Sequence, residues 1–308
     1  MSITWRSYRA AAMEILPKSF GENLNEWFRV LGRTWKPLLI ASLVAFVPMS
    51  LALAGILMFT GAADVFADLM DPEYLESIPD TEILEEFVPL IWVGAIWILL
   101  QSIATLFVYL AASRTVAEDR AGLASTWRTA ASHAGRRLVP ALLAGAIAFI
   151  GLVVLIALAV AVGWILIELM GTEFLAIFVT SVAALTTLVI LVWLALALSL
   201  YPQVMTMEEA GPTEALRRSF VLVRQRWWVT FGFVLVASVI ASAVSQVVGF
   251  VFAPLSILAM FNPQALAVVY VLVGLIQGPV AAAIAAANAV WYLDLRSRNE
   301  PLASDQIV

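Results

Sequence analysis

Residues 139–167 read VPALLAGAIAFIGLVVLIALAVAVGWILI and contain no charged side chain. A helix needs roughly 20 apolar residues to cross about 30 Å of hydrocarbon, so this stretch is long enough to span a membrane. Backbone polar groups in lipid must be hydrogen-bonded within their own element, which predicts a helix. Arg136 and Arg137 lie directly before the stretch and mark its boundary with water.

Five further apolar runs of this kind predict a membrane protein with six spans. The chain is 63% hydrophobic and 13% charged, whereas soluble globular domains are about 45–50% apolar and about 25% charged. We therefore expect an all-α, six-helix integral membrane bundle that forms a single domain over residues 1–308. The six spans are expected near residues 38–60, 88–112, 139–167, 174–201, 229–253 and 265–293.

The positive charges predict how these spans are oriented. The chain has 17 Lys and Arg residues, and the loops between spans one and two, three and four, and five and six contain none. Basic segments stay on the cytoplasmic side during insertion, so both termini are expected inside. The basic residues fall in four segments: six in 1–37, five in 113–138, four in 202–228 and two in 294–308.

An amphipathic stretch with apolar residues at helical spacing precedes each odd-numbered span. Such a helix belongs in the plane of the cytoplasmic interface, and Pro37 and Pro140 suit the first turn of the helix that follows. We interpret the chain as three units, 17–115, 120–201 and 212–294, each an interfacial helix plus a transmembrane hairpin. The alternative is three juxtamembrane helices that look alike only by composition. The apolar positions are Phe20, Leu24, Trp27, Leu31 and Trp35, then Leu123, Trp127, Ala130, Ala134 and Leu138, then Leu216, Phe220, Val223 and Trp227.

The basic side chains of these stretches are candidate contacts for anionic lipid head groups, at about 1 kcal/mol for each Lys or Arg near the surface. They lie against the membrane, so lipid and not nucleic acid is the expected partner. The candidate head-group contacts are Arg29, Arg33, Arg128, Arg136, Arg137, Arg217 and Arg224. Tryptophans mostly mark the span ends, as at membrane interfaces: Trp92, Trp97, Trp164, Trp193, Trp227, Trp228 and Trp291.

Small residues recur every fourth position in the last two spans. That spacing lets helix backbones approach closely in lipid, although alanine-rich helices also show it by chance. We expect both stripes to lie at helix–helix contacts, and one such arrangement has the two stripes facing each other. The stripes are Ala237, Ala241, Ser245 and Gly249 in span five, and Gly274, Gly278, Ala282 and Ala286 in span six.

Charged groups are absent deep within the spans, and the polar residues that remain are neutral. Interhelical hydrogen bonds, each worth about 0.6–2 kcal/mol, are one interpretation of these residues. A pathway for a lipid or a small neutral solute is the other. The candidates are Gln101, Thr105, Gln246, Gln277 and Asn288.

The first outward loop, residues 61–87, carries nine acidic residues and no basic one. A docking surface for cations or a basic partner is one interpretation of this loop. A solvated face that enforces topology is the other.

Sequence signals of an enzyme are missing. With no cysteine and the single histidine His133, histidine triads and clustered-histidine metal sites are not expected. No phosphate-binding glycine loop occurs either. We therefore expect a protein that is not an enzyme and that has no cofactor and no bound metal.

Three segments resemble a family of bacterial polytopic membrane domains that occur alone or fused ahead of glycerophosphodiester phosphodiesterases. They are 16–39, which includes LPKSFGENL, FRVL and WKPLL; 202–219, which includes EEAGPTEALRRS; and 292–298, YLDLRSR. The resemblance implies a stand-alone membrane domain of the bacterial cytoplasmic membrane, without the catalytic domain of the fused enzymes. Within these segments Glu214 with Arg218, and Asp294 with Arg298, are spaced to form ion pairs along a helix.

The function expected from the sequence is non-catalytic: a lipid-contacting scaffold or accessory subunit that engages partner proteins within the membrane. The alternative is a transporter or channel for a lipid or small neutral solute. A membrane enzyme is the weakest hypothesis, because no reactive constellation is visible.

Overall fold

The computed structural model describes residues 17–61, 83–170, 174–259 and 263–299, together with positions 65, 68 and 74. Within these residues the regular structure is helical, and six helices are long and apolar enough to cross a membrane. The predicted all-α, six-span class is thereby confirmed. In chain order the helices are α2 (Phe20–Phe59), α5 (Ile83–Arg120), α6 (Trp127–Met170), α7 (Phe174–Leu198), α8 (Tyr201–Met207), α9 (Pro212–Arg224), α10 (Trp227–Ala259) and α11 (Pro263–Asn299).

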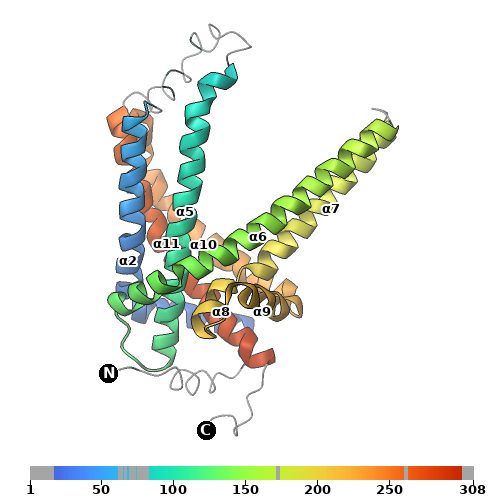
Figure 1. The fold of residues 1–308 in the computed structure, drawn as a ribbon. Coiled ribbons are helices and arrows are strands. Elements are labelled where there is room, and N and C mark those ends of the chain that lie inside the picture. The colour runs from blue at the N-terminus through green and yellow to red at the C-terminus, as the bar shows by residue number, and fades with distance from the viewer. Residues whose placement is uncertain are drawn as a thin grey trace.

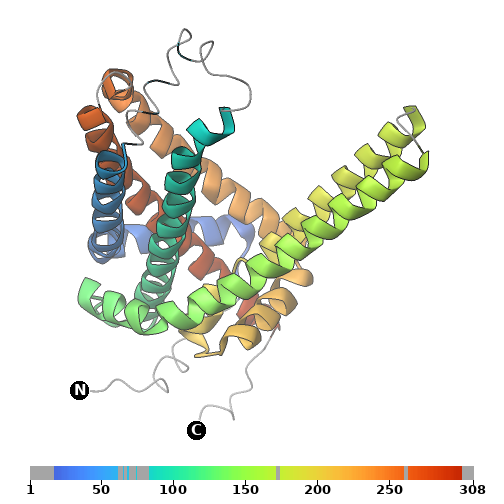
Figure 2. The ribbon, with the colours of Figure 1, turned by 45° about the horizontal axis from the view of Figure 1, so that its top comes forward.

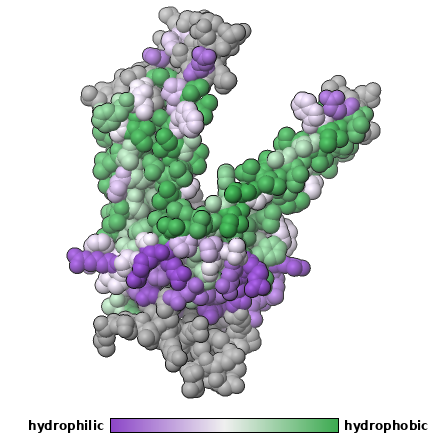
Figure 3. Space-filling model, in the orientation of Figure 1, coloured by the Kyte–Doolittle hydropathy of each residue, from purple (hydrophilic) through white to green (hydrophobic). Residues whose placement is uncertain are grey.

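The hydrophilic residues gather at one end of the molecule, as the band at the base of Figure 3 shows. We call this base the basic end. It carries the first part of α2, the end of α5, the start of α6, the short helices α8 and α9, and the end of α11 (Figure 1). The first and last described helix ends meet there, since the backbone N–H of Lys18 donates to Asp294 Oδ1 at 2.7 Å.

Two of the three predicted interfacial segments are the opening part of a long helix. α2 begins after Ser19 with a capping box, in which Ser19 and Glu22 exchange hydrogen bonds between side chain and backbone. Pro37 and Pro140 lie inside the continuous helices α2 and α6, and not at the first turn of new ones as predicted. An interior proline removes a backbone hydrogen bond and bends a helix, and the first part of α2 crosses the base before the rest rises (Figure 1). The third segment is the separate helix α9.

Helices α2, α5, α10 and α11 stand together as a column (Figures 1 and 2). The most extensive packing joins α11 to α2. There Gly278 lies against Phe46, and a Cβ added at Gly274 would come within 1.7 Å of Ser50 Oγ. The two glycines therefore let the backbones of α2 and α11 approach closely.

The two stripes of small residues do not meet through these glycines, because Gly274 and Gly278 face α2. Farther along α11, Ala282 and Ala286 are buried. The stripe on α10 is divided: Ala237 and Ala241 are buried, Ser245 is half-buried, and Gly249 is exposed with open space around its Cα.

Helices α6 and α7 form a hairpin that leans away from the column, which we call the α6–α7 arm (Figures 1 and 2). In each of the two spans of the arm, only 6% of the most apolar 18 residues are buried. The arm packs most extensively on α5, and it also contacts α9, α2, α8 and α10. Figure 3 shows an open wedge between two apolar surfaces, one on the arm and one on the column. The six spans are thus not one closed bundle.

Large side chains fill the column near the basic end. Trp27 is 1% exposed, and its indole N–H donates to the Ala283 carbonyl at 2.9 Å. Trp291, which the sequence placed in an interfacial belt, is buried, donates to Thr230 Oγ1 at 3.0 Å and stacks on Phe233. These two tryptophans therefore serve the core, with their polar atoms satisfied. The acidic loop 61–87 lies for most of its length outside the described residues.

We predict that Gly274→Ala lowers the melting temperature of the purified protein in detergent, because the added methyl group meets Ser50 across the α2–α11 contact. Overpacking of this kind costs about 1–3 kcal/mol. Gly249→Ala is the matched control, since the same change falls in open space. Adding Ser50→Gly to Gly274→Ala should recover much of the loss. Equal melting temperatures for the two alanine variants would contradict the close contact.

Candidate functional site

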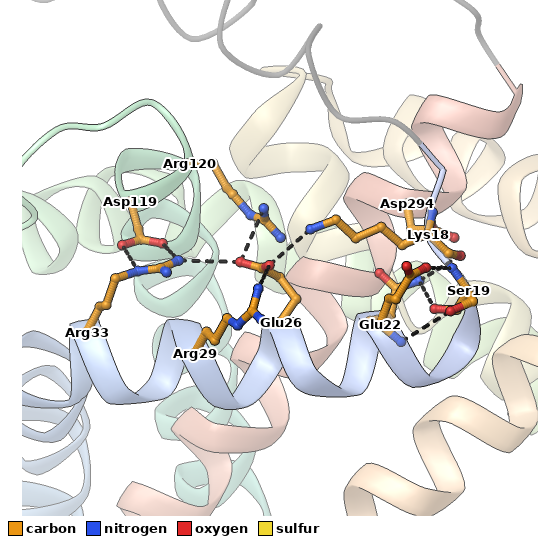
Figure 4. A network of polar contacts seen from close by, with 10 residues as sticks. Lys18, Ser19, Glu22, Glu26, Arg29, Arg33, Asp119, Arg120 and Asp294 are labelled. Carbon is orange, nitrogen blue, oxygen red and sulfur yellow. Dashed lines mark hydrogen bonds and ion pairs between the residues drawn. The ribbon is translucent and has the colours of Figure 1, made fainter.

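A buried carboxylate organises the ion pairs of the basic end (Figure 4). Glu26, on the first part of α2, is 6% exposed. Its Oε2 lies 3.0 Å from Lys18 Nζ and 4.0 Å from Arg29 Nη1. Its Oε1 lies 3.4 Å from Arg33 Nη2 and 3.3 Å from Arg120 Nη1. Glu26 thus pairs with four cations: Arg29 and Arg33 of α2, Lys18 two residues before that helix, and Arg120 of α5.

The charge state of Glu26 follows from these neighbours. Burial alone would raise the pKa of its carboxyl, but the hydrogen bond from Lys18 and the charges of Arg120 and Lys18 outweigh it. The pKa therefore lies below the ordinary value of 4.5. Glu26 is negative at neutral pH, and the cluster stabilises the folded state in that form.

Arg33 ties α2 to the end of α5. Its Nε donates to Asp119 Oδ1 at 3.0 Å, and its Nη2 donates to Oδ2 at 2.7 Å. A bidentate pair of this kind is stronger and more directional than a single contact. Together with the Arg120–Glu26 pair, it fixes the first part of α2 against the end of α5.

A second cluster joins α8, α9 and α11 around Glu208. Arg218 Nε lies 3.1 Å from Glu208 Oε2, Arg296 Nε lies 3.8 Å from Oε1, and the hydroxyl of Tyr292 donates to Oε1. Arg218 thus pairs with Glu208, and the predicted pair with Glu214 is not among the ion pairs of the described residues.

Asp294 links the start of α2 to the end of α11. It is 1% exposed, and its Oδ2 lies 2.6 Å from Arg298 Nε, which confirms the predicted pair. Arg298 also donates to the carbonyl of Lys18. The same carboxylate accepts the Lys18 backbone N–H, so the start of α2 is held at the end of α11.

The predicted head-group contacts divide into two groups. Arg33 is bound to Asp119 and Glu26, and Arg137 Nη2 lies 3.6 Å from Glu209. Arg29 is exposed, and among the described residues its acidic partner is Glu26, at the long distance of 4.0 Å. The remaining exposed guanidinium groups have no acidic partner among the described residues: Arg128, whose guanidinium lies over the Trp127 ring, Arg136, Arg217 and Arg224, joined by Arg226, which the sequence analysis missed.

The polar residues of the spans do not gather at one place. Gln101 Nε2 donates to Gln277 Oε1 at 2.9 Å, so an interhelical hydrogen bond joins α5 to α11. Thr105 is half-buried on α5, and Asn288 is 3% exposed on α11. Gln246 instead lies exposed on α10.

Gln246 belongs to a lateral groove of about 450 Å³ on the surface of α10. Ser242 and Ser245 line it beside Gln246, and Val280 of α11 forms part of its wall. The groove includes neither Gln101 nor Gln277, so these polar side chains do not form one pathway among the described residues.

A larger groove of about 730 Å³ lies between α7 and α10 near the basic end. It combines aromatic, apolar and basic side chains: Val189 and Trp193 of α7, Arg224, Gln225 and Arg226 at the junction of α9 and α10, and Trp227, Trp228 and Val229 of α10. The sequence did contain a signal for this groove. Two arginines lie just before a Trp-Trp pair at the end of a span, and aromatic residues of this kind are enriched at membrane interfaces.

The described residues offer little reactive chemistry. Burial, helped by Arg114, Arg137 and Arg136, lowers the pKa of His133 to about 4, so its ring is neutral at pH 7. No group of three His, Cys, Asp or Glu side chains in the described part of the chain could hold a metal ion.

Comparison with known proteins places the chain in a family. The family described as "Domain of unknown function (DUF7847)" matches residues 35–295. The chain belongs to this family. The DUF7847 match takes in Asp119, Glu208 and Asp294, while Glu26 and Arg33 lie just before it. No curated protein and no solved structure matches the chain.

We predict that Glu26→Gln destabilises the protein by about 3 kcal/mol at neutral pH, because removing one partner of a buried ion cluster leaves the others uncompensated. Thermal unfolding in detergent measures the change. Glu214→Gln is the matched control, since Glu214 is exposed and in no ion pair of the described residues.

The pH dependence gives a second measure of the same cluster. A lowered carboxyl pKa contributes stability above the ordinary value of 4.5, and this contribution disappears as the pH falls through the lower folded value. The difference in melting temperature between the wild type and Glu26→Gln should therefore become smaller below pH 4.5. A difference that stays constant, or no difference at neutral pH, would contradict the role of Glu26.

Proposed function

We propose that this protein is a non-catalytic scaffold or accessory subunit of the bacterial cytoplasmic membrane, which contacts anionic lipid at its basic end and binds partner membrane proteins through the α6–α7 arm. The arm is the observation that carries the proposal. Little of its two apolar spans is buried, and it meets the column chiefly through the packing of α6 on α5.

The arm suits a binding role for a physical reason. Lipid tails are as apolar as helix side chains, so helices associate in a membrane through close packing and not through a hydrophobic drive. A hairpin already separated from the column exposes long apolar faces of both of its helices, such as Phe149 and Val160 on α6. A partner helix can pack there without displacing any contact of the column.

We infer that the basic end faces the cytoplasm. The support is the separation of charge: the arginines of the second half of the chain lie at α9 and the end of α11, and those of the first half at the base of α2, α5 and α6. Exposed arginines without acidic partners suit the anionic inner leaflet. The resemblance to membrane domains fused with phosphodiesterases supports a membrane role alone, and we propose no phosphodiesterase activity for this chain.

One alternative has an observation in its favour. The groove at Ser242, Ser245 and Gln246 presents polar groups sideways to the bilayer. A transporter that moves a lipid or a small neutral solute would use such a groove. Against it, Gln101 and Gln277 are already paired with each other, and the glycines close the α2–α11 contact.

The test places a photo-activatable amino acid at Phe149 or Val160 of the arm, which are 67% and 65% exposed. Val44 and Leu51 on α2, 44% and 56% exposed, are the matched control positions. In native membranes we expect both arm positions, and neither α2 position, to give protein adducts of one defined mass. Lipid adducts alone at all four positions would contradict the scaffold.

Reconstitution separates the scaffold from the transporter. Liposomes that contain the protein should exchange fluorescent phospholipid between leaflets no faster than protein-free liposomes. The Gln246→Leu variant should give the same exchange rate as the wild type. Fast exchange that Gln246→Leu abolishes would replace the scaffold with a lipid transporter.

A further inference from the structure

We propose that the groove between α7 and α10 binds one anionic phospholipid, with its phosphate held by Arg224 and Arg226 and its acyl chains rising along Val189 and Val229. This inference rests on the proposed contact of the basic end with anionic lipid. It adds a single defined site to what would otherwise be a diffuse attraction.

The charge of the groove favours a phosphate. Arg224 and Arg226 are exposed and have no acidic partner among the described residues, whereas Arg33, Arg137 and Arg218 elsewhere at the basic end are in ion pairs. Guanidinium groups bind phosphate oxygens through charge-assisted and often bidentate hydrogen bonds. Two of them within three residues line one groove.

The aromatic walls of the groove are held in place by the protein itself. The Trp227 indole N–H donates to the Trp193 carbonyl at 3.3 Å, and Trp227 stacks on Phe231 at 5.3 Å. Trp193 in turn packs edge-on against Phe220 at 5.3 Å. These contacts join α7, α9 and α10, so the groove is a built feature. Trp228, 78% exposed, extends the wall outward.

The direction of the helices gives the groove the polarity of a phospholipid. Helix α7 runs toward the basic end and α10 runs away from it, so Val189 and Val229 lie on the membrane side of Trp193 and Arg226. The surface therefore passes from basic to aromatic to apolar as it enters the membrane. Its volume of about 730 Å³ falls within the roughly 300–1,000 Å³ of ligand pockets.

The position of the groove means that a bound lipid would contact both the arm and the column. The groove is lined by α7 of the arm and α10 of the column. A phospholipid there would contact both parts and support the arm at its angle to the column.

The experiment titrates the full-length protein in detergent with dioleoylphosphatidylglycerol or dioleoylphosphatidylcholine and counts bound lipid by native mass spectrometry. We expect one phosphatidylglycerol to bind more tightly than phosphatidylcholine. The double variant Arg224→Gln with Arg226→Gln should weaken phosphatidylglycerol binding by about tenfold or more.

The matched control is the double variant Arg136→Gln with Arg217→Gln. It removes the same charge from exposed arginines outside the groove, and it should change the affinity less than about twofold. Trp228→Ala tests the aromatic wall, and should weaken phosphatidylglycerol binding without unfolding, because Trp228 is exposed.

Four outcomes would overturn the site. Equal losses of phosphatidylglycerol affinity in the two double variants would show general electrostatic attraction to the basic end and no defined site. Displacement of the lipid by equimolar glycerol phosphate would make it a site for a soluble phosphate ester. A phosphatidylglycerol preference that survives in the Arg224/Arg226 variant would remove the site and leave the proposed function intact. No preference in the wild type would remove the site together with the proposed lipid contact of the basic end.

Discussion

Placing a lysine or arginine at the centre of a membrane helix costs about 2.5–3.5 kcal/mol on insertion scales, and the arrangement of this protein follows from that cost. The basic residues that the structure describes are gathered at one end, beside the first part of α2, the end of α5, the start of α6, α9 and the end of α11. Gathered cations repel one another unless acids lie among them. Glu26, Glu208 and Asp294 lie among them, and each ties together elements far apart in the sequence.

Above this charged base, two kinds of packing give the molecule its two parts. The column is held by close approach, where Gly274 and Gly278 admit α2 to α11, and by the Gln101–Gln277 hydrogen bond. The α6–α7 arm meets the column near the basic end, where Trp227 of α10 donates to the Trp193 carbonyl of α7, and many of its apolar side chains remain exposed. The open wedge between the two parts follows from this difference. Our proposals of partner binding and of a bound phospholipid concern the surfaces it leaves open.

The sequence predicted the six spans well, because length and charge exclusion are properties of the chain alone. It also predicted the Asp294–Arg298 pair, which depends only on helical spacing. It did not predict that Trp291 is buried, that the glycines of α11 face α2, or that the arm leaves the column. Hydropathy cannot distinguish a face that meets lipid from one that meets another helix, since both surroundings are apolar. Glu26 was missed because an acid among basic residues looks like a solvated surface until α5 brings Arg120 beside it.

The orientation of the chain is the claim on which the contact of the basic end with anionic lipid of the inner leaflet depends. The most direct test fuses topology reporters after Thr60, in the first acidic connection, and after Val308, at the end of the chain. We predict that a reporter active only outside the cytoplasm works after Thr60, and that a reporter active only inside works after Val308. A reporter after Thr60 that is active in the cytosol, or one after Val308 that is active in the periplasm, would contradict the orientation and with it the proposed lipid contacts.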